Sequence, residues 1–113
     1  MKKAHWVHDY ETLCNCFVAV FEHYKTSERK VYVIHDLQND LKEFLKFLET
    51  NEENKEWHIS YNGLAFDAQV TQYIMNNAQL WENMSGCAIS EAIYLFAQET
   101  IARQNRREFG IYA

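Results

Sequence analysis

The sequence has no proline and only three cysteines among its 113 residues. No repeat or low-complexity tract marks a linker, so residues 1–113 are expected to form one domain with one core. An odd cysteine count without secretory context is typical of a reducing compartment. Cys14 and Cys16 are two apart on an expected strand, where buried thiols are favoured over a metal pair.

Long apolar runs and positive charge are also scarce. No run approaches the roughly 18 apolar residues of a membrane span, and "MKKAHWVHDYET" reaches charge too soon for a signal peptide. The net charge of -5 argues against a protein that wraps nucleic acid chiefly through a basic face. It leaves room for an acidic site that meets phosphate through metal ions. We expect an intracellular protein without a membrane segment.

Hydrophobic periodicity predicts an α/β fold with a mixed sheet of about four strands and flanking helices. Strands are expected over 4–12, 14–24, 30–36 and 57–62, a loop over 49–56, and helices from residue 36, over 68–84 and over 87–107. The first helix is indicated by Leu37, Leu41, Phe44, Leu45 and Leu48, and the last by Ile89, Ile93, Leu95, Phe96 and Ile101. Because the first helix lies between two strands, a right-handed crossover predicts a fourth strand parallel to its neighbour.

Three acidic residues form the candidate chemical site. Asp9 and Glu11 share one face of the first strand, and Asp67 opens the helix that follows the fourth strand. If these strands pair, the carboxylates could converge and bind Mg²⁺ or Mn²⁺. Two such ions form the clamp that is used for in-line attack on a phosphodiester. The alternative is that each acid has a local role: Asp67 as a helix N-cap, Glu11 in a turn and Asp9 at the surface.

Two segments resemble motifs of a known family. "HDYET" resembles the first exonuclease motif, Asp-x-Glu-Thr, of the DnaQ-like 3′–5′ exonucleases, a branch of the RNase H-like superfamily that includes the proofreading domains of family B DNA polymerases. "YNGLAFDAQV" resembles their second motif, Asn-x-x-x-Phe-Asp, and the intervening residues follow the same order of two strands, helix and strand. The resemblance implies an RNase H-like fold and a metal-dependent exonuclease that hydrolyses the terminal phosphodiester of single-stranded DNA.

The resemblance also assigns roles to individual positions. Asp9, Glu11 and Asp67 correspond to catalytic residues that bind a pair of Mg²⁺ or Mn²⁺ ions. Thr12 and Leu13 correspond to contacts with the terminal nucleotide, Asn62 to a residue that steadies the site or the DNA backbone, and Phe66 to a residue beside the substrate. For Leu13 and Phe66, a place in the core is an equal alternative.

A third motif, with a further acid preceded by Tyr or His, is not recognisable. After Asp67 the acids are glutamates only, at 82, 91, 99 and 108. A surface position is expected for Glu91 and Glu99, and the alternative is that one of them supplies the missing metal ligand. The resemblance therefore implies a partial exonuclease domain, incomplete at the C-terminus and similar to compact phage replication proteins. Its partners would be a single-stranded DNA 3′ end and a DNA polymerase or the missing C-terminal segment. The alternatives are an inactive remnant that binds nucleic acid or a polymerase, and a small interaction protein.

Overall fold

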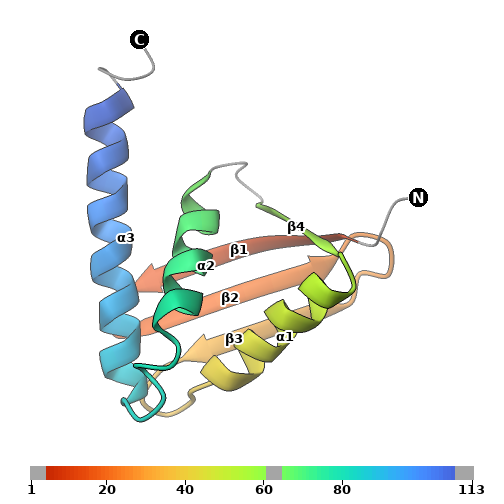
Figure 1. Ribbon diagram of the computed structural model, residues 1–113, viewed down its shortest axis with the longest axis horizontal. Helices are drawn as coiled ribbons and strands as arrows, with labels where there is room; N and C mark the ends of the chain where they lie inside the picture. The colour runs from red at the N-terminus through yellow and green to blue at the C-terminus, as the bar shows by residue number, and fades with distance from the viewer. Residues whose placement is uncertain (1–4, 61–64, 109–113) are drawn as a thin grey trace.

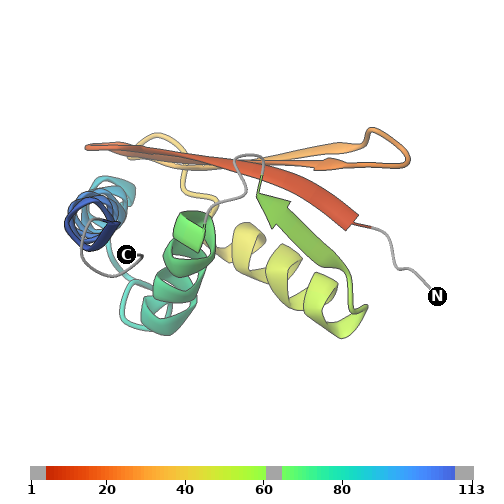
Figure 2. The same cartoon turned by 90° about the horizontal axis from the view of Figure 1, so that it is seen from above.

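The computed structural model describes residues 5–60 and 65–108. Four strands form one sheet, and three helices all lie on the same side of it (Figures 1 and 2). The elements in chain order are β1 (His5–Leu13), β2 (Cys16–His23), β3 (Arg29–Ile34), α1 (Leu41–Glu53), β4 (Trp57–Ser60), α2 (Ala65–Asn77) and α3 (Gly86–Glu108). No helix within these two ranges is both long enough and apolar enough to cross a membrane.

The sheet has the order β3-β2-β1-β4. β1, β2 and β3 are antiparallel neighbours, whereas β4 pairs with β1 in parallel, so the prediction of a mixed α/β sheet with a parallel fourth strand is confirmed. In the hairpin, Leu13 pairs with Cys16, which leaves Cys14 and Asn15 as a two-residue turn. The expected burial of two strand thiols is therefore wrong, because Cys14 is exposed in the turn and Cys16 is half-buried.

The core lies between the sheet and the helices. Its fully buried large side chains come from every layer: Phe17, Phe21 and Ile34 from the strands, Phe44 from α1, Val70 and Ile74 from α2, and Ile89 and Ile93 from α3. The described residues of β1 and β2 enter the core alternately because successive side chains point to opposite faces of a sheet. This one-sided packing leaves the other face of the sheet without a helix among the described residues (Figure 2).

The first helix begins five residues later than its hydrophobic pattern predicts. Leu37 is 90% exposed in a turn, and α1 starts at Leu41. Asp40 ties this turn to β3 by accepting a hydrogen bond from the Val33 amide (3.0 Å), and Asn39 accepts one from the Leu41 amide at the start of α1 (3.1 Å). Such local bonds from Asp and Asn compete with helix formation, so the helix cannot extend back to Leu37.

The other end of α1 and the buried face of α3 also differ from expectation. α1 continues to Glu53, so only residues 54–56 connect it to β4. On α3, Leu95 and Ile101 are exposed, whereas Ala97 and Thr100 are buried with Ile89 and Ile93. Spacing alone could not identify this stripe, because the buried line of the helix is completed by small residues rather than by large apolar ones.

Gly86 fixes where α3 starts against the sheet. A Cβ at this position would lie 2.0 Å from the carbonyl oxygen of His35, so the helix approaches the end of β3 too closely for a side chain. The next residue reinforces this contact, since the Cys87 amide donates a hydrogen bond to Oδ1 of Asp36 (2.9 Å). The segment after β3 is thus tied both to α1 and to α3.

Candidate functional site

The pleat of β1 divides the "HDYET" segment between the two faces of the sheet. Trp6, His8 and Tyr10 are buried beneath the helices. Asp9 and Glu11 alternate with them, are exposed, and point to the opposite face. The aromatic residues therefore decide which face of β1 is internal, and the two acids take the other face.

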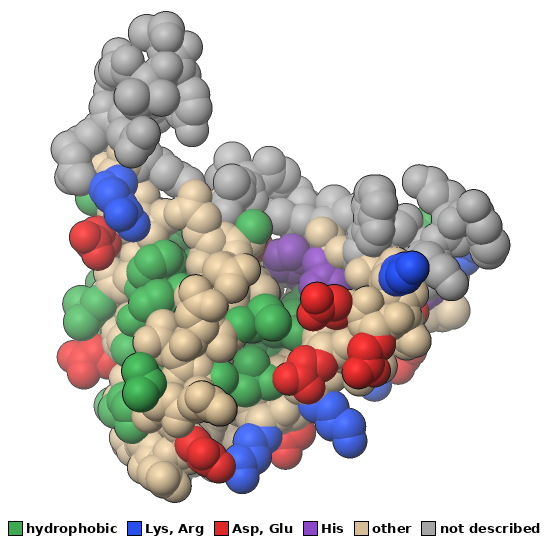
Figure 3. Space-filling model, viewed as in Figure 1, with side chains coloured by type: hydrophobic (Ala, Val, Ile, Leu, Met, Phe, Trp, Pro, Cys, Tyr) green, Lys and Arg blue, Asp and Glu red, His purple; other side chains and the backbone are tan. Residues whose placement is uncertain are grey.

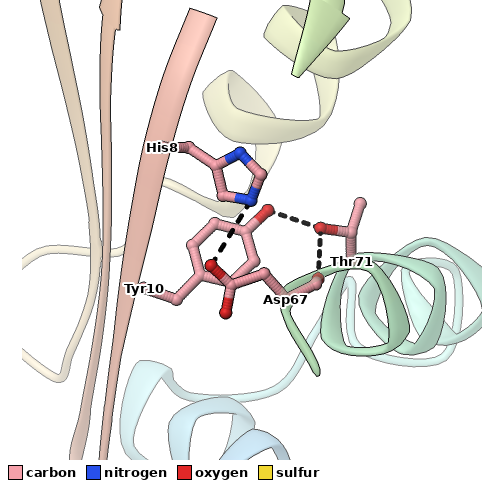
Figure 4. Close-up of polar contacts among 4 residues, drawn as sticks. All are labelled: His8, Tyr10, Asp67 and Thr71. Carbon is pink, nitrogen blue, oxygen red and sulfur yellow. Dashed lines mark hydrogen bonds and ion pairs between the residues drawn. The ribbon is translucent and has the colours of Figure 1, made fainter. Parts of the chain in front are cut away.

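Asp67 lies on the helix side of the sheet, in the first turn of α2. It is only 5% exposed, and its Oδ2 lies 3.4 Å from Nε2 of His8 (Figure 4). β4 leads into this helix and pairs with β1 such that Ser60 is opposite His8. Asp67 therefore lies beside β1, as expected from the pairing of the first and fourth strands. The residue of β1 that it contacts, however, is His8.

The three carboxylates consequently do not converge. Asp9 and Glu11 project from one face of the sheet, and Asp67 is buried against the other. Within residues 5–60 and 65–108, no three His, Cys, Asp or Glu side chains are grouped so as to hold a metal ion. The donor set expected for Mg²⁺ or Mn²⁺ is therefore not assembled in this conformation, and no chemical step through such an ion follows from it.

The residues around Asp67 form a buried polar cluster, called here the His8 cluster: His8, Tyr10, Asp67 and Thr71 (Figure 4). The Thr71 hydroxyl donates to the backbone carbonyl of Asp67 (2.9 Å), so Thr71 Oγ1 accepts from the Tyr10 hydroxyl. This chain of bonds ties the middle of β1 to the first turns of α2. Neither ring nitrogen of His8 has a hydrogen-bond partner among the described atoms.

Burial controls the protonation of this cluster. Burial, with a smaller contribution from the nearby His58, lowers the pKa of His8 from 6.5 to about 4. At neutral pH the His8 ring is therefore uncharged, and its contact with Asp67 joins a neutral imidazole to a carboxylate. Burial also raises the pKa of Tyr10, with a smaller contribution from Asp67, so its hydroxyl remains a proton donor.

A second, half-buried histidine lies beside the cluster. The ring of His58, on β4, is centred 6.0 Å from that of His8, and burial lowers its pKa as well. Its Nε2 lies 2.7 Å from the side-chain nitrogen of Asn51 near the end of α1. A neutral His58 that accepts this hydrogen bond is consistent with the lowered pKa.

The remaining candidate residues are dispersed. Thr12 is half-buried near the end of β1, Leu13 is exposed beside the hairpin turn, and Phe66 packs at the edge of the core. Asn62 lies outside the described residues. Glu91 and Glu99 are exposed on α3, as expected for surface glutamates.

Among the described residues, a hollow lies on each side of the sheet. The hollow on the helix side has a volume of about 610 Å³ and lies between α1 and the α2–α3 connection, where acidic side chains gather over α1 in Figure 3. The hollow on the open face has about 370 Å³ and is lined by Asp9 among other residues. Asp67 lines neither of these two hollows.

No role was predicted from the sequence for His8, Tyr10 or Thr71. A signal for the first two exists, because Trp6, His8 and Tyr10 are alternate aromatic residues on one strand, which is typical of a buried face. Thr71 follows Asp67 by four residues, the spacing at which a hydroxyl reaches the backbone carbonyl one turn earlier. Neither signal depends on the acids.

The fold and the site thus define a mixed α/β domain in which a buried histidine on β1 contacts a buried aspartate in the first turn of α2. In comparisons with known proteins, no family model, no curated protein and no solved structure matches the chain.

Proposed function

We propose that this chain is a domain of the DnaQ-like 3′–5′ exonuclease type, with an RNase H-like architecture, that acts on the 3′ end of single-stranded DNA. The observation that supports the proposal is the order and pairing of its elements. "HDYET" lies on β1, two strands, a helix and a parallel strand follow, and "FD" opens α2 beside β1. This is the order that the two motifs imply.

The proposal requires Asp9 and Glu11 to share a site with Asp67. They are separated by the pleat of β1, and a one-residue shift of that strand would bring them to the helix face. Such a shift would also move His8 and Tyr10 out of the core. Turnover by this chain would therefore depend on a rearrangement of β1.

A second function is favoured by the same geometry. The acids lie on opposite faces, and Asp67 is buried against His8, as expected for an exonuclease-like domain that has lost catalysis and binds a partner. Under this alternative the motifs reflect common ancestry with exonucleases, and the chain neither binds a pair of cations nor degrades DNA.

A nuclease assay separates the two functions. The purified chain is incubated with a 5′-labelled single-stranded oligonucleotide in Mn²⁺, beside Asp9→Ala/Glu11→Ala, Asp67→Asn and the control Glu22→Gln. Glu22 is an acid on the same open face that the motif does not include. The exonuclease proposal expects stepwise shortening from the 3′ end that both motif variants abolish and the control retains. No shortening by a folded wild-type chain would contradict it.

Calorimetric titration with Mn²⁺ gives a second measurement that does not depend on turnover. Saturable binding that both Asp9→Ala and Asp67→Asn abolish would mean that the acids meet in solution. Binding lost only in Asp9→Ala would assign the ion to the open face and leave Asp67 as a structural residue.

A further inference from the structure

The open face of the sheet is apolar where a solvated sheet is expected to be polar. Its outward-pointing residues include Val7 on β1, Val18 and Val20 on β2, and Val31 and Val33 on β3, and these five are called here the valine face. Val18 pairs with Val33 and Val20 with Val31, so four of the side chains form a continuous two-by-two patch.

This composition departs from the usual rule for a sheet with one solvated face. Antiparallel sheets of that kind alternate apolar residues inside with polar residues outside. Here β2 and β3 place valine at successive outward positions, and Val31 is 47% exposed. Figure 2 shows no described helix over this side of the sheet. Because burial of apolar surface stabilises by roughly 25 cal/mol per Å², a cover for this patch would be favourable.

Acidic residues border the valine face on one side. Asp9 is paired with Val20 and Glu11 with Val18, so the two carboxylates form a row along β1 beside the patch. Among the described residues, neither acid forms an ion pair with Lys, Arg or His. On the same face, Arg29 of β3 is already paired with Glu22 at 3.3 Å. Within the described part of the chain, the border along β1 therefore carries negative charge that no cationic side chain pairs with.

The face is also hollowed between the acids and the valines. The hollow of about 370 Å³ is lined by Val7, Asp9, Val20, Glu22 and Tyr24, together with His8. Its lining combines valine side chains with the carboxylates of Asp9 and Glu22. A long side chain with an aliphatic stem and a cationic end, such as Lys or Arg, is complementary to this lining.

We propose that the valine face binds an amphipathic helix of a partner protein, with aliphatic side chains on the valines and Lys or Arg on Asp9 and Glu11. The two acids are about 6.7 Å apart along the strand, and basic residues at i and i+4 of a helix are about 6 Å apart. A helix about 10 Å across also covers two to three strands at their spacing of about 4.8 Å. The inference does not depend on nuclease activity, and it assigns a function to valines that the nuclease proposal does not use.

The test uses two synthetic helical peptides and fluorescence anisotropy. Both peptides carry leucine at i, i+3, i+4 and i+7; one has lysine at the flanking positions and the other has glutamate. The lysine peptide is expected to bind the wild-type chain saturably and at least about tenfold more tightly than the glutamate peptide, with a preference that falls as salt rises. Equal affinity for the two peptides would overturn the charge assignment.

Chain variants locate the binding on this face. Val20→Thr/Val31→Thr keeps the side-chain shape but adds hydroxyls. This variant is expected to bind the lysine peptide about tenfold more weakly, or weaker still. Leu80→Thr, which changes a 75% exposed leucine between α2 and α3, is the matched control and should bind as the wild type does. Unchanged affinity in the valine variant would overturn the proposal.

Two further measurements keep the test decisive. Should the valine variant fail to fold, Asp9→Asn/Glu11→Gln replaces it and is expected to lose the preference for lysine over glutamate. Sedimentation of the wild-type chain detects self-association, and a dimer that the valine substitutions dissociate would overturn the assignment to a partner in favour of a second copy. Nuclease activity, where present, should be unchanged by Val20→Thr/Val31→Thr, which separates this proposal from the nuclease one.

Discussion

The two faces of the sheet are made by the same strands and differ in almost every property. The helix-covered face holds fully buried aromatic and aliphatic side chains and the His8 cluster. The open face holds five valines, the acids of "HDYET" and a surface ion pair. Since adjacent residues of one strand belong to opposite faces, each comparison between them can be made with neighbours in the sequence.

The contrast teaches that chemistry-bearing residues two apart in sequence share a face, whereas their immediate neighbours do not. Asp9 and His8 are adjacent, yet one is exposed and the other meets Asp67 beneath α2. The position of β1 in the sheet therefore determines which residues of the motif can act together. Any functional assignment to this segment is also a statement about strand register.

The largest expected difference between the faces is in packing. Ile34→Ala removes a fully buried side chain beneath the helices and should lower the free energy of unfolding by about 2–5 kcal/mol. Val33→Ala, the neighbouring residue on the open face, should cost about 1 kcal/mol or less because its surroundings already admit water. Urea unfolding of both variants measures the difference. Equal losses would mean that the open face is covered in the isolated chain.

Acidification is expected to act through the covered face. The folded-state pKa of His8 is about 4 and its ordinary value is 6.5, so between these values the unfolded chain binds more protons than the folded one. The His8 contribution is complete above pH 6.5 and is lost as the pH falls toward 4, by up to about 3 kcal/mol. Unfolding free energies at pH 7, 5.5 and 4.5 measure this slope.

The control for this prediction is His8→Gln, which keeps a polar side chain but does not titrate. Its stability should fall less steeply between pH 7 and 4.5 than that of the wild type, with the remaining slope assigned to His58 and other groups. Parallel curves for the two proteins would show that His8 is not the titrating group.

Loss of one hydroxyl from the His8 cluster should have a smaller effect. Thr71→Val leaves the buried Tyr10 hydroxyl without its acceptor and is expected to cost about 1–3 kcal/mol. Tyr10→Phe/Thr71→Val removes both partners and should recover part of that loss. A double-mutant cycle in thermal or urea unfolding measures the coupling, and strictly additive losses would mean that the two hydroxyls do not depend on each other.

Much of the fold could be predicted from the sequence, because strands and helices follow local periodicity. The sheet, the parallel fourth strand and the existence of all three helices follow from the spacing of apolar residues and from crossover handedness. The start of α1 did not follow, since Asp40 and Asn39 form side-chain bonds that no periodicity reveals.

The candidate site was harder to predict, for a different physical reason. A strand pattern states that Asp9 and Glu11 share a face but not which face is covered, and the helices make that choice by packing on Trp6, His8 and Tyr10. The motif emphasised the acids, whereas burial followed the aromatic residues. Convergence with Asp67 was therefore an assumption about the tertiary fold.

The smallest expected effect belongs to the ion pair on the open face. Glu22 and Arg29 are 3.3 Å apart with both side chains largely exposed, so Glu22→Gln should change the unfolding free energy by less than about 0.5 kcal/mol, and less still at high salt. Asp67→Asn is its counterpart on the covered face, and its carboxylate is shielded from salt by burial. Unfolding at low and high ionic strength should distinguish them: the small effect of Glu22→Gln vanishes with salt, whereas that of Asp67→Asn persists. A salt-sensitive Asp67→Asn effect would mean that water reaches the His8 cluster.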